Sequence, residues 1–173
     1  MHQGAFFEAL CLAQLYKLPC IFICENNYYA MGTSLERQSA ITDLHRRADG
    51  VGMKNEQFEG FDVEVVRQKV AEAREYARSG QGPVLLEVIT YRHRGHSMSD
   101  PAKYRPEGEL EEKKASDPLV ITQTRLMEDF GMSGDEIDAL NKEVDAVAKE
   151  SYAFAEQSPE PDPRTIYDFV YAD

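Results

Sequence analysis

Residues 20–24 form an unbroken run of apolar and thiol side chains, and after Glu25 the run is followed by Asn26 and Asn27. Such a run is typical of a strand buried on both faces of a parallel sheet. Ligands of parallel sheets bind beyond the carboxyl ends of the strands, so the two side-chain amides stand where a ligand site is expected. An amide oxygen suits Mg²⁺ or Ca²⁺ bound to phosphate, although such sites normally also need carboxylate charge. The alternative is a turn in which both asparagines supply only local hydrogen bonds and left-handed backbone geometry.

A second apolar run, residues 83–91, predicts a second strand. Asp62 is a candidate N-cap for a helix that reaches about residue 79 and ends at the glycines that follow. We expect this helix to join the two strands by a right-handed crossover, which makes the sheet parallel. The two strand ends then deliver their polar side chains to the same edge.

The second predicted strand is followed by Arg92, Arg94 and His96. Guanidinium groups bind phosphate in bidentate fashion, and an imidazole donates to phosphate or moves a proton, so this cluster fits an anionic ligand. A solvated loop histidine is one alternative. A zinc pair of His93 and His96 is another, but no third nitrogen or sulfur ligand falls at a usable spacing.

The remaining segments predict an α/β fold, a parallel sheet with flanking helices, followed by a helical C-terminal region. Residues 3–16 have helical apolar spacing, and residues 28–52 predict loop with short helical pieces. We divide the chain into residues 1–100, a partial α/β domain, and 101–173, the active-site loop and helical C-terminal region of the same domain. That region comprises helices at 119–130 and 133–157. In the second helix, Ser133 and Glu136 form a capping box, and the expected buried stripe consists of Ile137, Leu140, Val144 and Val147. A proline-rich connector follows, and then an apolar patch at 166–171 that we expect to pack against another part of the protein.

Composition narrows the class of protein. With 173 residues, 42% of them apolar, the chain is long enough for one α/β domain with a genuine core. A net charge of -12 argues against binding to nucleic acid or to an anionic membrane surface. Three cysteines, two of them at the ends of the first predicted strand, suit reduced thiols and no disulfide. A signal peptide and an apolar span of about 18 residues are both missing, so we expect a soluble location.

Four segments together resemble the alpha subunits of the pyruvate dehydrogenase first component, in the thiamine-diphosphate-dependent 2-oxo acid dehydrogenase family. They are QGAFFEAL (3–10), KLP (17–19), CENNYYAMGT (24–33) and YRHRGHSMSDP (91–101). The resemblance runs across the whole chain but covers only the C-terminal half of such a subunit. It implies part of a thiamine-diphosphate-binding fold, and the oxidative decarboxylation of pyruvate with acetyl transfer to a lipoyl group. The implied cofactors are thiamine diphosphate and Mg²⁺, and the implied partners are a beta subunit and a lipoyl-bearing acyltransferase component.

The resemblance also assigns site residues. Asn27 would bind the metal through its side chain, and Tyr29 would offer its backbone carbonyl to the metal or diphosphate. Arg92 would position the cofactor or loop, and His96 would contact the cofactor and take part in catalysis. The Asp of the family's Gly-Asp-Gly signature falls before Met1, so we expect a truncated chain that is inactive alone and does not bind magnesium and thiamine diphosphate tightly.

Three further alternatives remain open. Branched-chain 2-oxo acid and acetoin dehydrogenase alpha subunits share the Asn-Asn and Gly-His-Ser elements, and a truncated copy can serve as a non-catalytic assembly module. Ser97 and Ser34 match serines that are phosphorylated in mitochondrial members, where phosphate would add charge beside the diphosphate. The segment after Asp100 and the short Pro-Glu-Pro tail look bacterial. We therefore favour a cytoplasmic, bacterial location rather than the mitochondrial matrix, with both serines acting as loop hydrogen-bonding residues.

Overall fold

The protein is described by a computed structural model that covers residues 1–168 and 170. The described residues fall into two compact units, Met1–Arg125 and Leu126–Asp173. The first unit holds the sheet and the polar strand ends, and the second is helical. The domain boundary expected at residue 100 stays a prediction.

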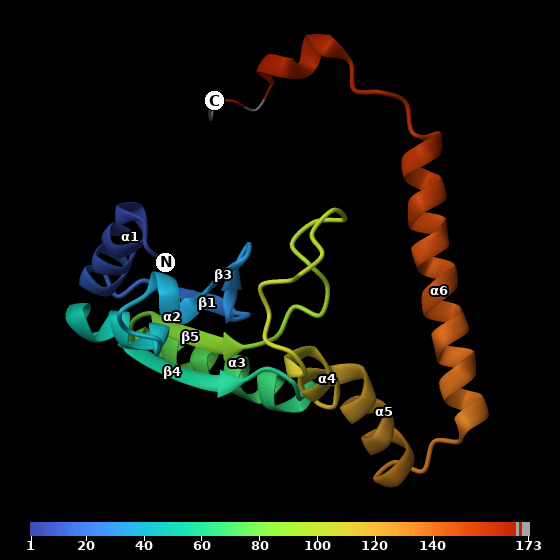
Figure 1. Ribbon diagram of the computed structural model, residues 1–173. Helices are drawn as coiled ribbons and strands as arrows, with labels where there is room; N and C mark the ends of the chain where they lie inside the picture. The colour runs from blue at the N-terminus through green and yellow to red at the C-terminus, as the bar shows by residue number, and fades with distance from the viewer. Residues whose placement is uncertain (169, 171–173) are drawn as a thin grey trace. The chain divides into compact units, whose positions relative to one another are not determined.

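Within the described residues, β1 (Ile21–Asn26), β4 (Lys54–Glu59) and β5 (Val84–Ile89) form a three-stranded parallel sheet in the order β1-β5-β4 (Figure 1). The last residues of β1 and β4, Asn26 and Glu59, both lie opposite Ile89, the last residue of β5. All three strands therefore end at one edge. The predicted α/β class and the parallel sheet are confirmed.

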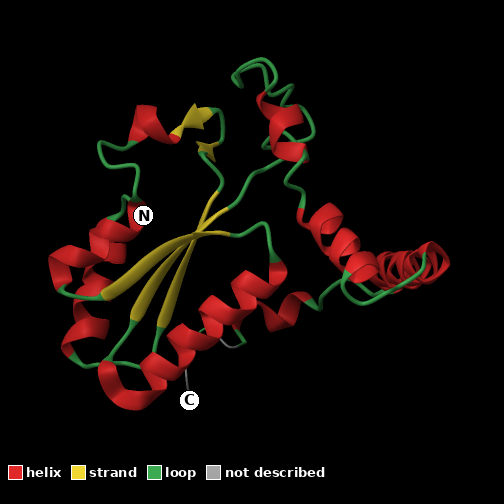
Figure 2. Cartoon of the chain, turned by 90° about the horizontal axis from the view of Figure 1, so that it is seen from below, coloured by secondary structure: helices red, strands yellow, loops and turns green. Residues whose placement is uncertain are grey.

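The central strand β5 is buried along its whole length because helices lie on both faces of the sheet (Figure 2). On one face, Val84 and Leu86 pack with Ala73 of α3 (Val63–Tyr76). On the other face, Leu85 packs with Leu10 of α1 (Gly4–Leu15) and with the helix η1 (Leu44–Val51). Alternate residues of one strand thus hold two cores together.

The strand β4 is absent from the sequence-based expectation, which joined β1 directly to β5 through the helix after Asp62. In the structure α3 follows β4 and leads into β5, and its N-cap is Asp62 as predicted, since the Asp62 side chain accepts from the Glu64 N–H. Apart from Phe58, the residues of β4 are polar or charged. Such a strand gives no apolar signal, and it is tolerated because β4 lies at the sheet edge.

The expectation that β1 is buried on both faces is wrong for this structure. Among the described residues β1 pairs only with β5, and Ile23 is 51% exposed. Cys20 and Cys24 are half-buried and Cys11 is exposed. All three thiols are free, as predicted.

Short elements connect the sheet to the site. The predicted loop after β1 contains a small antiparallel hairpin that the sequence did not indicate, and then helical pieces that it did. The elements of this loop are β2 (Tyr29–Ala30), β3 (Thr33–Ser34), α2 (Leu35–Gln38) and η1. Two more short helices lie elsewhere: η2 (Ala77–Gln81) follows α3, and α4 (Glu109–Lys114) follows the loop after β5.

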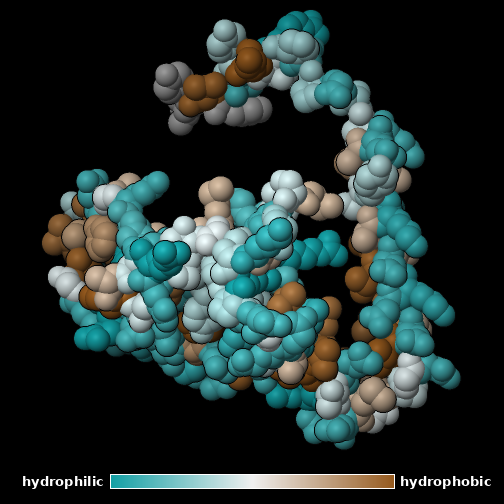
Figure 3. Space-filling model, in the orientation of Figure 1, coloured by the Kyte–Doolittle hydropathy of each residue, from teal (hydrophilic) through white to brown (hydrophobic). Residues whose placement is uncertain are grey.

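The helix α5 (Pro118–Glu128) precedes the long helix α6 (Gly134–Gln157) and the short η3 (Pro163–Tyr167). The capping box of Ser133 and Glu136 is confirmed, but the predicted buried stripe of α6 is not. Ile137 is buried, whereas Val144 and Val147 are 59% and 62% exposed. Apolar surface is visible along α6 (Figure 3). In the expected docking patch, Ile166 and Tyr167 are exposed, and positions 169 and 171 lie outside the described residues. As far as the described residues go, no helix is both long and apolar enough to cross a bilayer.

Candidate functional site

The carboxyl end of β1 continues into two overlapping turns. The Asn26 Oδ1 atom accepts the Tyr28 N–H at 3.1 Å, and the Asn27 Oδ1 atom accepts the Tyr29 N–H at 3.1 Å. Tyr28 has a left-handed φ of 66°. The turn that was expected as an alternative to a ligand site is therefore present, but it does not exclude one. An amide oxygen has two lone pairs, so Asn27 Oδ1 keeps the capacity for a second partner.

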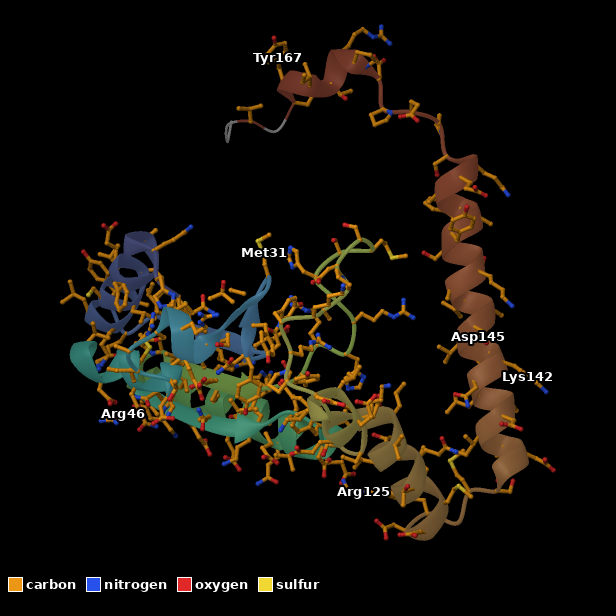
Figure 4. All side chains as sticks on the ribbon, in the orientation of Figure 1. Met31, Arg46, Arg125, Lys142, Asp145 and Tyr167 are labelled. Carbon is orange, nitrogen blue, oxygen red and sulfur yellow. The ribbon has the colours of Figure 1, made fainter. Side chains whose placement is uncertain are left out.

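The turns lead into the β2–β3 hairpin, in which Tyr29 pairs with Ser34 and Met31 lies at the tip (Figure 4). The Met31 carbonyl accepts a hydrogen bond of 2.7 Å from Nη2 of Arg92, which follows β5. The chain segments after β1 and β5 are therefore joined by a direct contact, as their shared sheet edge predicts.

Arg92 also lies beside His96. Its Nη1 atom is 3.4 Å from Nδ1 of His96, and its Nη2 atom donates to the Tyr104 hydroxyl at 3.1 Å. Because a guanidinium can only donate, this contact makes His96 Nδ1 an acceptor and leaves the proton of the neutral ring on Nε2. Arg94, by contrast, is exposed and contributes its backbone carbonyl to the loop.

Three residues hold the loop that carries His96. Asp100 accepts from the backbone N–H of His96 at 2.7 Å and from the Tyr104 hydroxyl at 2.8 Å. These bonds lower the pKa of the Asp100 carboxyl below its usual value, with the His96 N–H as the first cause. The Arg105 guanidinium donates to the carbonyls of Arg92, His93 and Arg94. The loop is thus fixed by side chains that lie several residues downstream.

Tyr29 is fixed at both its backbone, which donates to Asn27, and its side-chain hydroxyl. Its hydroxyl donates to Oε2 of Glu109 in α4 at 2.8 Å. Burial, followed by this bond, raises the pKa of Tyr29 to about 12. The hydroxyl therefore stays protonated at neutral pH, and Tyr29 is also one of the residues that line the pocket described next.

A pocket of about 210 Å³ lies over the end of β1 and includes Asn27, Tyr29, His2 and Gln38 in its lining. His96 lines a different hollow, formed by residues of its own loop. The structure therefore brings Asn27 and Tyr29 together. The Met31 contact connects them to Arg92 and His96. A second connection runs through Tyr104, whose ring centroid lies 5.4 Å from that of Tyr29 and whose hydroxyl accepts from Arg92. Throughout the part of the chain that is described, no three His, Cys, Asp or Glu side chains are grouped as a metal site.

The other candidate residues have structural neighbours of their own. His93 Nδ1 lies 3.4 Å from Asp117 Oδ2, and Ser97 Oγ lies 3.1 Å from Ser99 Oγ. Ser34 is the N-cap residue of α2.

Comparison with known proteins identifies the family. The family described as Dehydrogenase E1 component matches residues 1–164. This chain belongs to the dehydrogenase E1 component family. The resemblance inferred from the four sequence segments is confirmed at that level.

Relatives of this E1 component chain include bacterial and mitochondrial proteins. It is 44% identical over 167 residues to the pyruvate dehydrogenase E1 component subunit alpha of Rhizobium meliloti (strain 1021), covering 96% of this chain and 48% of the relative. The subunit of the same name from Rickettsia conorii is 41% identical over 171 residues, 99% of this chain and 52% of the relative. The human mitochondrial somatic form is 44% identical over 163 residues, 92% and 41% of the two chains. The chain therefore spans about half the length of the curated relatives it matches.

Sequence reasoning did not single out several residues that shape the site of this E1 component chain. Asp100, Tyr104 and Arg105 belong to a stretch whose composition only indicates loop. Glu87 had a usable signal, because it is the one charged residue of the β5 segment Val84–Ile89 and is fully buried. A buried charge in an apolar strand needs partners, and those partners lie at the site.

Proposed function

We propose that this E1 component chain supplies part of a pyruvate dehydrogenase site, which decarboxylates pyruvate oxidatively and passes the acetyl group to a lipoyl group. The observation that carries the proposal is the hydrogen bond from Arg92 to the Met31 carbonyl. It joins the turn that presents Asn27 to the loop that presents His96. Relatives named as pyruvate dehydrogenase alpha subunits support the choice of pyruvate.

The residues at the end of β1 fit Mg²⁺ that is also bound to a diphosphate. The Asn27 amide oxygen and the Tyr29 carbonyl are neutral hard donors, and Mg²⁺ in phosphate sites takes few protein ligands and completes its shell with phosphate and water. The described residues hold no group of three His, Cys, Asp or Glu side chains here, so most of the negative charge beside the metal would come from the diphosphate. When bound, thiamine diphosphate supplies the carbanion nucleophile and the electron sink for decarboxylation of a 2-oxo acid.

The roles of the other residues follow from their hydrogen bonds. Arg92 holds the hairpin and the His96 ring in one arrangement, and its charge favours an anionic ligand. His96, with Nδ1 accepting, presents Nε2–H for donation to a substrate oxygen or for proton transfer. His96 is exposed, so it is accessible to a substrate that enters from solvent.

Function also requires partners. We propose a beta subunit, which completes the heterotetramer of the first component, and a lipoyl-bearing acyltransferase component that receives the acetyl group. The location that we propose is the bacterial cytoplasm. A chain that spans about half of its relatives is expected to be inactive by itself.

The test uses the full gene product assembled with its co-expressed partner subunit. Pyruvate turnover is measured with and without Mg²⁺ and thiamine diphosphate, and branched-chain 2-oxo acids and acetoin are tried beside pyruvate. We expect dependence on both cofactors and a preference for pyruvate. His96→Gln should lower turnover by at least about a hundredfold, the typical contribution of a positioned acid or base.

Two matched controls separate chemistry from loop packing. His93→Gln changes the same residue type in the same loop but on the side of Asp117, and it should keep most of the activity. Asn27→Ala should weaken Mg²⁺ dependence, whereas Asn141→Ala, on the exposed surface of α6, should not. Turnover without added cofactors, or equal losses in His93→Gln and His96→Gln, would contradict the proposal.

A further inference from the structure

The fully buried carboxylate of Glu87 lies at the centre of the sheet and receives two hydrogen bonds. The Asn26 Nδ2 atom donates to its Oε1 at 2.7 Å, and the backbone N–H of His45 donates to its Oε2 at 2.8 Å. Asn26 is the last residue of β1, and His45 belongs to η1. One carboxylate thus connects the middle strand, the edge strand and the helix beside the pocket.

The hydrogen bonds that link Tyr28, Asn26, Glu87 and His45 each have a defined donor and acceptor, because a backbone N–H stands at both ends of the series. The Tyr28 N–H can only donate, so it fixes Oδ1 of Asn26 as an acceptor and turns Nδ2 toward Glu87. The His45 N–H can also only donate. The residue at position 87 must therefore accept at both ends, which a carboxylate does and a neutral amide cannot.

A neutral amide at position 87 leaves one mismatch wherever it is oriented. If its oxygen faces His45, its NH₂ group meets the NH₂ group of Asn26. If Asn26 then flips, its NH₂ group meets the Tyr28 N–H. The mismatch is buried, since Asn26 is 6% exposed, and it falls on the turn that contains Asn27.

Two titratable side chains, Cys24 and Tyr28, are affected by the carboxylate of Glu87. Cys24 pairs with Glu87 in the register of β1 and β5. Burial, and after it the negative charge of Glu87, raises the pKa of the Cys24 thiol to about 11. Burial also raises the pKa of Tyr28, with Glu59 and Glu87 as further causes.

We propose that Glu87 is a positioning residue, whose carboxylate orients the Asn26 amide and thereby sets the turn that presents Asn27 to the pocket. For the identity of the ligand at Asn27 this inference rests on the proposed function. For the turn itself it rests only on the contacts of Glu87, Asn26 and Tyr28. The two parts can be tested separately.

The first measurement is amide hydrogen exchange in the full gene product, in peptides that cover residues 25–30. Glu87→Gln should accelerate exchange of the Tyr28 amide by at least about tenfold, as expected for the loss of a buried hydrogen bond to a charged group. The double variant Asn26→Asp/Glu87→Gln should restore exchange to within about threefold of wild type. A carboxylate at position 26 accepts from the Tyr28 N–H and from the new amide at position 87, whose oxygen accepts from the His45 N–H.

The second measurement is the affinity for Mn²⁺, used in place of Mg²⁺, in the presence of thiamine diphosphate. Glu87→Gln should weaken it by about tenfold or more. Val84→Ala is the control, because Val84 is buried on the opposite face of the same strand and its truncation destabilises the sheet without touching the turn. It should leave the Mn²⁺ affinity at the wild-type value.

Each outcome decides something. Unchanged exchange in Glu87→Gln, or no rescue in the double variant, overturns the positioning role, as does a double variant that fails to fold. Equal loss of Mn²⁺ affinity in Val84→Ala and Glu87→Gln reduces Glu87 to a fold-stabilising residue. If wild-type protein binds no Mn²⁺ with thiamine diphosphate, the proposed function fails, and the exchange data still decide the role of Glu87 in the turn.

Discussion

Replacement of Arg105 by lysine should release the loop that carries His96. The two terminal nitrogens of Arg105 reach three consecutive carbonyls: Nη1 donates to His93, and Nη2 donates to Arg92 and Arg94. The guanidinium also lies 5.1 Å from the ring centroid of Tyr91. A lysine keeps the charge but has one donor atom, which cannot span three carbonyls.

The magnitude follows from the number of bonds lost. A hydrogen bond contributes about 1 kcal/mol net, and a lysine at this position retains about one of the three. The substitution therefore lowers the free energy of opening the loop by about 2 kcal/mol, which is close to a thirtyfold change in the equilibrium between closed and open loop. The contact with the aromatic rings adds little to the difference, since an ammonium keeps most of it.

Hydrogen exchange of the backbone amides of residues 92–100 measures this opening directly. We expect about thirtyfold faster exchange in Arg105→Lys, with the amides of β5 unchanged. Arg67→Lys, at an exposed position of α3, is the matched control and should leave the loop at the wild-type rate. Loop exchange within threefold of wild type in Arg105→Lys would refute the reasoning.

Three further predictions concern Cys24 and Gly95. With its pKa raised to about 11, Cys24 should react with iodoacetamide at pH 8 at least tenfold more slowly than exposed Cys11, as measured by peptide mapping. The pKa of Cys24 in the folded protein lies above its unfolded value of 9.0, so Cys24 lowers the free energy of unfolding as pH rises from 9 toward 11. Urea unfolding should detect this loss in wild type, and the loss should be absent in Cys24→Ala. Gly95→Ala would place its Cβ 2.3 Å from the Asp100 carbonyl oxygen, so it should break the His96–Asp100 contact and accelerate loop exchange, unlike Gly50→Ala, where nothing lies within 4 Å.

Much of the fold could be predicted because its signals are local. The apolar runs indicated β1 and β5, and the acceptors Asp62 and Ser133 indicated helix starts that the structure confirms. The polar strand β4 could not be predicted, because it carries no apolar periodicity and owes its conformation to pairing with β5. The exposed stripe of α6 shows the opposite error, since an amphipathic pattern indicates a surface for packing but does not supply the partner.

The sequence by itself determined that polar side chains follow two apolar strands, and their order resembles that of the E1 alpha subunits. It could not determine which of these side chains meet. Only the tertiary structure decided that Arg92 reaches the Met31 carbonyl, that Arg105 holds the His96 loop, and that Glu87 binds Asn26 and His45. The physical reason is that a strand end follows from local apolar pattern, whereas the partners of a buried charge or a guanidinium come from segments distant in sequence that the packed sheet brings together.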